Sequence, residues 1–288
     1  MKVRGQLIEA DWNFLHGNPP AQPSSPALPE ALANCTGEQA FQESLSRHSQ
    51  YLPRIANTHH GIWFDWILYK YALPSGNEVD FAYVETTSAQ NTIVLIEIED
   101  PAKKMWVGSL QTPHRSEKFN HAIEQVTRWR TDLNDPAQRT ALIDGFKSTF
   151  GQSSLVDNQW DVKYGLVYGR SAENISAQQK SSYADLQRTC GIELMTFDNL
   201  VTRQKNHPAQ LRNVMSVSVP GPVFSYLYLN KLPRSDFAYL KPGRLKLDQE
   251  AKEVLVAQGY DISAWENGTL LGLNGKAPFS SLSTSILP

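Results

Sequence analysis

The chain has 288 residues, of which 41% are hydrophobic and 19% are charged, and its formal net charge is -2. Length and composition predict a soluble globular protein with an ample core, and the small net charge excludes a global basic field that would attract nucleic acid. Cys35 and Cys190 are the only cysteines and lack metal-ligand spacing, which excludes a zinc ribbon or a disulfide framework.

The N-terminal segment lacks the pattern of a signal peptide. Glu9 and Asp11 stand where a signal peptide requires apolar residues, and no apolar run in the sequence is long enough to span a membrane. The low cysteine content fits a reducing compartment. We therefore expect a cytoplasmic protein that has no membrane partner.

Residues 1–33 are predicted to form an N-terminal extension. Apolar residues within 1–16 predict a short strand. Five prolines mixed with serines between positions 17 and 29 predict a linker, because proline is incompatible with a helix interior or a central strand. The compact domain is expected to begin at residue 34.

The first part of that domain is predicted to contain a helix and three strands. Thr36 and Gln39 form a capping-box pattern at the start of a helix over 37–49. The predicted strands, rich in aromatic and β-branched residues, are 61–73, 78–84 and 92–99. Turn residues after the first strand predict an antiparallel meander, and Pro101 ends the third strand.

The second part of the domain is predicted to alternate helices with strands. Helical periodicity predicts a helix over 116–133, and Pro136 suits the first turn of another. The remaining predicted elements are a strand over 162–168, a helix over 176–191, a strand over 192–195 and a helix over 197–203. Together these elements predict a mixed α/β domain over 34–208.

Residues 209–288 are predicted to form a C-terminal extension. The stretch 231–246 has five basic residues with aromatic residues between them, a pattern that fits either nucleic-acid binding or a solvated connector. A short helix is predicted from Asp248 to Gly259, and 280–288 has the composition of a disordered tail.

Three carboxylates mark two adjacent strands of the predicted meander. Asp80 lies in the second strand, whereas Glu97 and Glu99 are two residues apart in the third and therefore project from one face. Their neighbours are strongly apolar, and no basic residue lies between Asp80 and Glu99. Because an unpaired buried carboxylate is costly, the pattern predicts a divalent metal site. The alternative is an exposed strand end at which the acids are merely solvated.

The order of these elements resembles the PD-(D/E)XK nuclease superfamily, which has a mixed-sheet αβββαβ core. That core has an acid on its second strand and an acidic pair on its third. Here the pattern reads Val79-Asp80, then sixteen residues, then Glu97-Ile98-Glu99.

Five stretches are similar to those of one branch of this superfamily, the Shedu anti-phage defence nucleases. They are GEQAFQESL, NEVDFAYV, IVLIEIEDP, AIEQVTRWR, and YGLVYGR with the following helix and IELMTFDNLVTR. The resemblance extends over residues 36–205, and the order and spacing of the stretches make it more specific than the acidic motif.

The resemblance implies a metal-dependent DNA endonuclease that acts in bacterial defence against phage and assembles as a homo-oligomer. Asp80, Glu97 and the main-chain carbonyl of Ile98 would bind Mg²⁺ or Mn²⁺, which prefer oxygen ligands. Gln125, on the following helix, would position the attacking water or a phosphate.

Glu99 departs from the family pattern, which has a lysine at this position. A glutamate lacks that positive charge, but it can accept a proton as a general base or bind a second metal ion. The departure leaves two hypotheses open. Retention of Asp80, Glu97 and Gln125 favours an active endonuclease. The alternative is a catalytically degenerate nuclease-fold protein that acts as a nucleic-acid-binding or interaction module.

Overall fold

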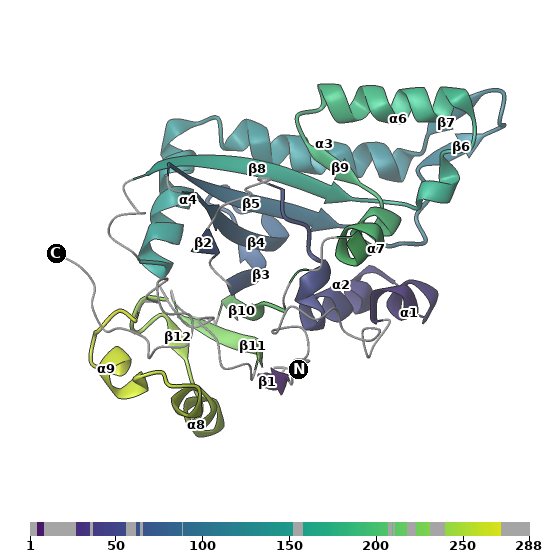
Figure 1. The fold of residues 1–288 in the computed structure, drawn as a ribbon. Helices are drawn as coiled ribbons and strands as arrows, with labels where there is room; N and C mark the ends of the chain where they lie inside the picture. The colour runs from purple at the N-terminus through teal and green to yellow at the C-terminus, as the bar shows by residue number, and fades with distance from the viewer. Residues whose placement is uncertain are drawn as a thin grey trace.

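The computed structural model describes residues 5–8, 27–34, 37–55, 62–63, 66–87, 89–151, 158–206, 209, 211–217, 223–230 and 240–271. Within these residues, ten strands form one mixed sheet, and two short strands form a separate hairpin (Figure 1). The strands of the main sheet are β1 (Gln6–Ile8), β2 (Ile62–Trp63), β3 (Trp66–Ala72), β4 (Glu78–Thr86), β5 (Gln90–Ile98), β8 (Gln159–Val167), β9 (Glu193–Met195), β10 (Asn213–Val217), β11 (Phe224–Asn230) and β12 (Leu245–Lys246). The hairpin consists of β6 (Trp106–Gly108) and β7 (Pro113–Arg115).

The central strands follow the predicted meander. Strands β3, β4 and β5 are antiparallel neighbours, while β8 pairs in parallel with β5, and β9 with β8. The predicted strand over 61–73 is divided into β2 and β3, and residues 64–65 lie outside the described part of the chain. This arrangement confirms the mixed α/β class.

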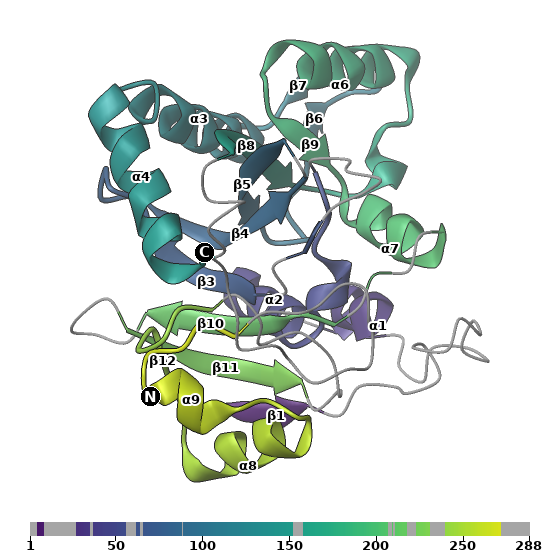
Figure 2. The same cartoon turned by 60° about the vertical axis from the view of Figure 1, so that its left-hand side comes forward.

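The helices cover both faces of the sheet (Figure 2). The described helices are α1 (Ala27–Asn34), α2 (Glu38–Arg47), α3 (Glu117–Asp132), α4 (Pro136–Thr149), α6 (Ala177–Thr189), α7 (Phe197–Asn206), α8 (Gln249–Ala257) and α9 (Ile262–Glu266), with single 3₁₀ turns at η2 (Ser49–Tyr51) and η3 (Ser171–Glu173). Helices α3, α4 and α6 contribute to one apolar cluster, whereas α1, α2 and α7 contribute to a second.

Alternation along the central strands explains why both faces are covered. On β5, Ile93 and Leu95 pack into the cluster with α3, while Val94 and Ile96 pack into the cluster with α2. All four side chains are fully buried. The consecutive apolar residues 93–96 are therefore covered on both faces of the sheet, as is typical of a buried strand. None of the helices that the structure describes combines the length and the apolar character that crossing a membrane requires.

Local sequence signals set most helix boundaries. The Ser116 side chain accepts a hydrogen bond from the Phe119 N–H at the start of α3, and Ser176 with Gln179 forms a capping box at the start of α6. The Asp248 side chain caps α8 in the same way. These helices confirm the predictions made from capping residues and periodicity.

One prediction about the N-terminal helices is wrong, and another concerns a residue that the structure does not describe. The residue that caps α2 is Gly37, at a φ of 91°, and it provides no side-chain cap. Thr36, from which a capping box was predicted, lies outside the described residues. Helix α1 begins at Ala27, inside the stretch that was predicted to be a linker. Pro29 is accommodated because it lies in the first turn, where a backbone N–H has no helical partner to lose.

The terminal extensions continue the central sheet. Strand β10 pairs in parallel with β3, β11 pairs with β10, and the short N-terminal strand β1 pairs in parallel with β11. The sheet therefore runs past residue 208, where the predicted core ends. Of the basic stretch, residues 231–239 lie outside the described residues, as does the predicted tail at 280–288.

Ser49 connects the C-terminal extension to the core. Its hydroxyl donates to the Arg212 carbonyl at 2.7 Å and accepts from the Arg212 N–H at 2.7 Å. Ser49 is fully buried, so water cannot take the place of its hydroxyl as the hydrogen-bond partner of these backbone groups. The Arg212 guanidinium adds a bond to the Leu52 carbonyl at 3.0 Å.

We expect Ser49→Ala to lower the free energy of unfolding by about 1–3 kcal/mol, because it leaves a buried donor and acceptor unpaired. Urea unfolding followed by tryptophan fluorescence measures the change. Ser181→Ala, at an exposed position of α6, is the control and should shift the free energy by less than about 0.5 kcal/mol. Equal effects of the two substitutions would show that Ser49 does not anchor the extension.

Candidate active site

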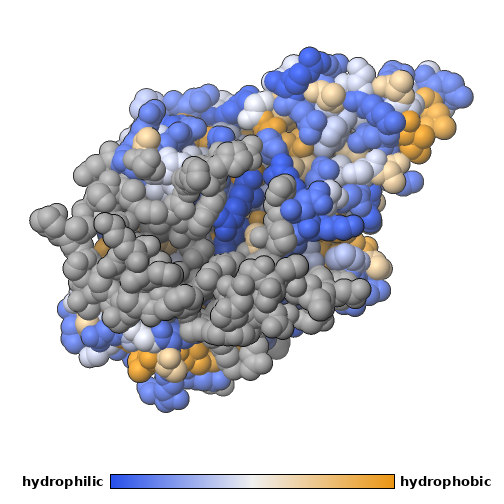
Figure 3. Space-filling model, viewed as in Figure 1, coloured by the Kyte–Doolittle hydropathy of each residue, from blue (hydrophilic) through white to orange (hydrophobic). Residues whose placement is uncertain are grey.

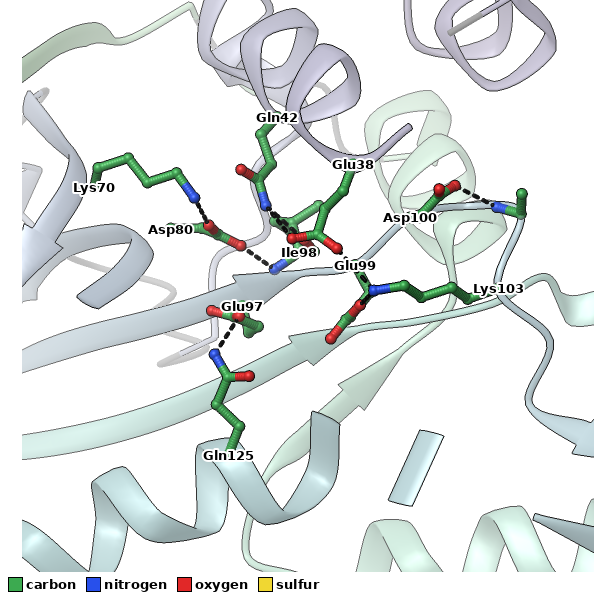
Figure 4. Close-up of polar contacts among 11 residues, drawn as sticks. Glu38, Gln42, Lys70, Asp80, Glu97, Ile98, Glu99, Asp100, Lys103 and Gln125 are labelled. Atoms are coloured by element: carbon green, nitrogen blue, oxygen red, sulfur yellow. Dashed lines mark hydrogen bonds and ion pairs between the residues drawn. The ribbon is translucent and has the colours of Figure 1, made fainter. Parts of the chain in front are cut away.

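The candidate site lies where β4 and β5 stop pairing. Their register runs from Thr86↔Asn91 to Phe81↔Ile96 and goes no further. Beyond this point the side chain of Asp80 replaces a strand partner, because its Oδ2 accepts the Ile98 N–H at 2.8 Å (Figure 4). This bond fixes the carboxylate of Asp80, which is 3% exposed, beside the end of β5.

Lys70 reaches Asp80 from an irregular position in β3. The pairs Tyr69↔Phe81 and Tyr71↔Val79 place Lys70 opposite Asp80, and the Lys70 ammonium forms an ion pair with Asp80 Oδ1. Among the described residues other than glycine, Lys70 alone has a positive φ, 51°. Such a conformation costs on the order of 1–3 kcal/mol and persists only where the surrounding structure imposes it.

Glu97 has one oxygen held and one oxygen unpartnered. Gln125, on α3, donates from Nε2 to Glu97 Oε1 at 2.5 Å (Figure 4). Glu97 Oε2 is buried and has no hydrogen-bond partner among the described residues. Gln125 thus contacts Glu97 at the strand end where Asp80 also lies; these are three of the residues that the family resemblance singled out. An unpartnered buried carboxylate oxygen is suited to a cation.

The carbonyl of Ile98 is held from the opposite layer of helices. Gln42, which is 1% exposed on α2, donates from Nε2 to the Ile98 oxygen at 2.9 Å. A carbonyl oxygen has two lone pairs, so this bond leaves one acceptor position. The two main-chain groups of Ile98 are therefore fixed by two side chains, Asp80 and Gln42.

Glu99 has different neighbours from Glu97. Its carboxylate forms an ion pair with Lys103, whose ammonium also donates to Glu38 Oε2 at 2.8 Å. In Figure 4, Glu99 lies on the Lys103 side of the strand end, and Glu97 lies on the Gln125 side. Two carboxylates thus share one ammonium beyond the end of β5.

Burial makes these carboxylates reluctant to ionise. Desolvation raises the pKa of Asp80 to about 6, although Lys70 acts in the opposite direction. Burial and the nearby charges of Asp80 and Glu99 raise the pKa of Glu97 well above its usual range, and burial also raises the pKa of Glu99. Ionised carboxylates here would be stabilised by an additional cation.

The charge of the cluster fits a divalent ion. Its four carboxylates, when ionised, carry two more charges than its two ammonium groups neutralise; the members are Glu38, Asp80, Glu97, Glu99, Lys70 and Lys103. In the described part of the chain, no three His, Cys, Asp or Glu side chains converge to hold a metal ion by themselves. The donor set at the strand ends is therefore two carboxylates, from Asp80 and Glu97, and the Ile98 carbonyl.

Several residues of the cluster were not identified from the sequence. Glu38 and Gln42 lie one turn apart on α2, and a hydrogen bond of 3.3 Å joins their side chains. In the sequence they are only a polar pair next to the buried apolar residues of this helix. Lys103 lies four residues after Glu99. Lys70 could not be identified from the sequence, because its side chain reaches Asp80 only through the local irregularity of β3.

The surface over this region is polar. Figure 3 shows a strip of hydrophilic residues in the middle of the face that Figure 1 presents, where β4 and β5 lie. The fold and the strand-end carboxylates together define a mixed α/β protein with a buried acidic site.

The comparison with protein families identifies this class more closely. The family model described as "Shedu protein SduA, C-terminal" matches residues 36–201, which is more than half of the chain. The chain belongs to the Shedu family, as the resemblance of its five stretches predicted. Membership of this family suggests a role in anti-phage defence. No curated protein matches the chain.

We expect Glu97→Gln to stabilise the protein in the absence of divalent ions, with an effect that grows with pH. The pKa of Glu97 is raised on folding, so rising pH favours the unfolded state, in which this group ionises more readily. Glutamine keeps the acceptor for Gln125 and removes the titrating group. Thermal unfolding in EDTA at pH 5 and pH 8 measures the effect.

At pH 8 the midpoint should rise by at least about 2 °C, since roughly 1 kcal/mol corresponds to about 2–4 °C in a protein of this size. Glu124→Gln, at an exposed position of the same helix as Gln125, controls for loss of one surface carboxylate. A gain that is equal at both pH values would contradict the assignment of this titration to Glu97.

Proposed function

We propose that this protein is a metal-dependent DNA endonuclease that hydrolyses phosphodiester bonds in bacterial defence against phage. The observation that carries the proposal is the geometry of Glu97, whose Oε1 is held by Gln125 while its buried Oε2 has no partner among the described residues. Asp80 and the Ile98 carbonyl lie at the same strand ends. The resemblance to the PD-(D/E)XK superfamily supports the same reaction, with DNA and further copies of the chain as partners.

Asp80, Glu97 and the carbonyl of Ile98 would hold Mg²⁺ or Mn²⁺. All three are oxygen donors, and each carboxylate oxygen of Asp80 keeps a lone pair beyond its bond to Lys70 or to the Ile98 N–H. When bound, the ion would supply Lewis-acid stabilisation of charge on the phosphoryl group and acidify water.

Glu99 would accept the proton of the attacking water. Its raised pKa makes its carboxylate a better proton acceptor than an ordinary glutamate. Its other proposed role is to bind a second ion. Gln125 would orient Glu97 through Oε1, and the second N–H of its amide would point a hydrogen bond at water or phosphate.

A catalytically degenerate protein that binds nucleic acid is the second candidate function. The observation that favours it is the pairing of Glu99 with Lys103, because a carboxylate already neutralised by an ammonium is a weaker ligand and a weaker base. The two functions differ in the consequences of adding a divalent ion and of changing Glu99.

We expect purified protein to cleave plasmid and linear DNA in Mn²⁺ and not in EDTA. Calorimetry should detect Mn²⁺ binding that Asp80→Asn or Glu97→Gln abolishes while the thermal transition persists. Asp161→Asn is the control, since Asp161 is paired with Arg139 and lies at the other end of the sheet. Binding by both site variants at parental affinity would place the metal site elsewhere.

Substitutions of Glu99 separate an active enzyme from a degenerate one. Glu99→Gln keeps the shape but removes the proton-accepting charge, so cleavage should fall about a hundredfold or more. Glu99→Lys adds an ammonium beside Lys103 and would repel a second ion, so cleavage and Mn²⁺ affinity should both fall. Initial rates on supercoiled plasmid measure both variants. A gain of cleavage on introducing lysine would instead indicate a decayed site.

A further inference from the structure

The two lysines of the acidic cluster are held differently. Lys103 is paired with two carboxylates, those of Glu38 and Glu99. Lys70 is paired with one buried carboxylate, Asp80, and otherwise comes only within 4.0 Å of the exposed Glu78. An ammonium has three N–H donors, so Lys70 has more capacity left for a further anion.

The side chain of Lys70 enters the cluster from the solvent side. It is 33% exposed, whereas the side chain of its partner Asp80 is 4% exposed. In Figure 4 the Lys70 side chain extends toward Asp80 from the side of the cluster opposite Lys103. Its partly exposed ammonium is therefore the group of this ion pair that a ligand from solvent can contact. The Lys70 position is polar at the tip and partly accessible, as a contact to a negatively charged ligand requires.

A strained backbone directs Lys70 to this position. Tyr69 packs with the cluster on the α2 face and Tyr71 with the cluster on the α3 face, although residues two apart in a regular strand share one face. On β4, Val79 and Phe81 are divided between the two faces in the same way. Both strands therefore change face at the point where Lys70, at a φ of 51°, meets Asp80. Strain of this kind is retained mainly where it serves a site.

Phosphodiester hydrolysis requires positive charge at such a place. The water oxygen bonds to phosphorus, the bond from phosphorus to the leaving sugar oxygen breaks, the water gives up a proton and the leaving oxygen takes one up. Negative charge builds on the phosphoryl oxygens during this exchange, and fixed cations there lower the barrier. Glu99 has no such charge to supply.

We propose that Lys70 is a catalytic residue of this site that donates hydrogen bonds to the phosphodiester undergoing cleavage. The inference rests on the proposed nuclease function and adds a residue from β3, outside the strand-end motif. Asp80 positions the ammonium through one N–H, and the remaining donors face the substrate. Lys103 instead holds Glu38 and Glu99 together.

Lys70→Met and Lys70→Gln test this role. Two variants are used so that, if one fails to fold, the other can still be measured. Both side chains are unbranched at Cβ and Cγ, are one atom shorter than lysine and carry no charge. Plasmid cleavage in Mn²⁺ should fall by about a hundredfold or more, as for other lost charge-stabilising donors. Calorimetric Mn²⁺ affinity should stay within threefold of the parent or increase, roughly as expected when a neighbouring positive charge is removed.

Lys252→Met is the matched control, because Lys252 has a similar exposure of 32% and is also ion-paired, with Glu266 at 2.7 Å, on a helix outside the site. It should cleave at the parental rate. Cleavage by the folded Lys70 variants at the parental rate would overturn the role of Lys70 alone. Loss of Mn²⁺ binding together with cleavage would also overturn it, since Lys70 would then only arrange the metal ligands. Absence of cleavage by the parent would overturn the proposed function, and the role of Lys70 with it.

Discussion

The hydrogen bond from the Ile98 N–H to Asp80 is the contact on which the acidic site depends. A main-chain donor at the end of a buried strand must be satisfied, and here a carboxylate satisfies it in place of the neighbouring strand. Because Asp80 takes the place of a strand partner, β4 and β5 stop pairing here and the Asp80 carboxylate is fixed near Glu97. The Ile98 carbonyl then accepts its hydrogen bond from Gln42. Asp80 and the Ile98 carbonyl are thus positioned by bonds that also satisfy main-chain groups of β5, while Gln125 positions Glu97.

The same burial that stabilises the sheet makes ionised carboxylates costly at the acidic site. Helices on both faces exclude water from β4 and β5. The carboxylates at the ends of these strands are therefore also buried. Desolvation is accordingly the largest cause of the raised pKa of Asp80, of Glu97 and of Glu99. Without a further cation, the protein must hold protons or unpaired charge at this cluster, and both lower its stability.

The sequence predicts those parts of the structure that depend on local patterns. Apolar strands and turn residues predicted the meander, and helical periodicity predicted α3. The family resemblance, rather than a local pattern, pointed to Gln125, which contacts Glu97. Features set by distant contacts were not predictable. Lys70 meets Asp80 because two strands change face together, and Gln42 reaches Ile98 across 56 positions of the chain. Proline content also misled the prediction at α1, since Pro29 falls in its first turn.

The charge of residue 99 sets the net charge of the acidic cluster. With glutamate, four carboxylates face the ammonium groups of Lys70 and Lys103, and two negative charges remain. A lysine at this position would leave three carboxylates facing three ammonium groups, a neutral cluster with weaker attraction for a cation. Glu99 therefore increases the electrostatic reason to bind a divalent ion. A decayed site would be expected to lose that reason, and the buried Glu97 oxygen would then have acquired a partner from the protein instead.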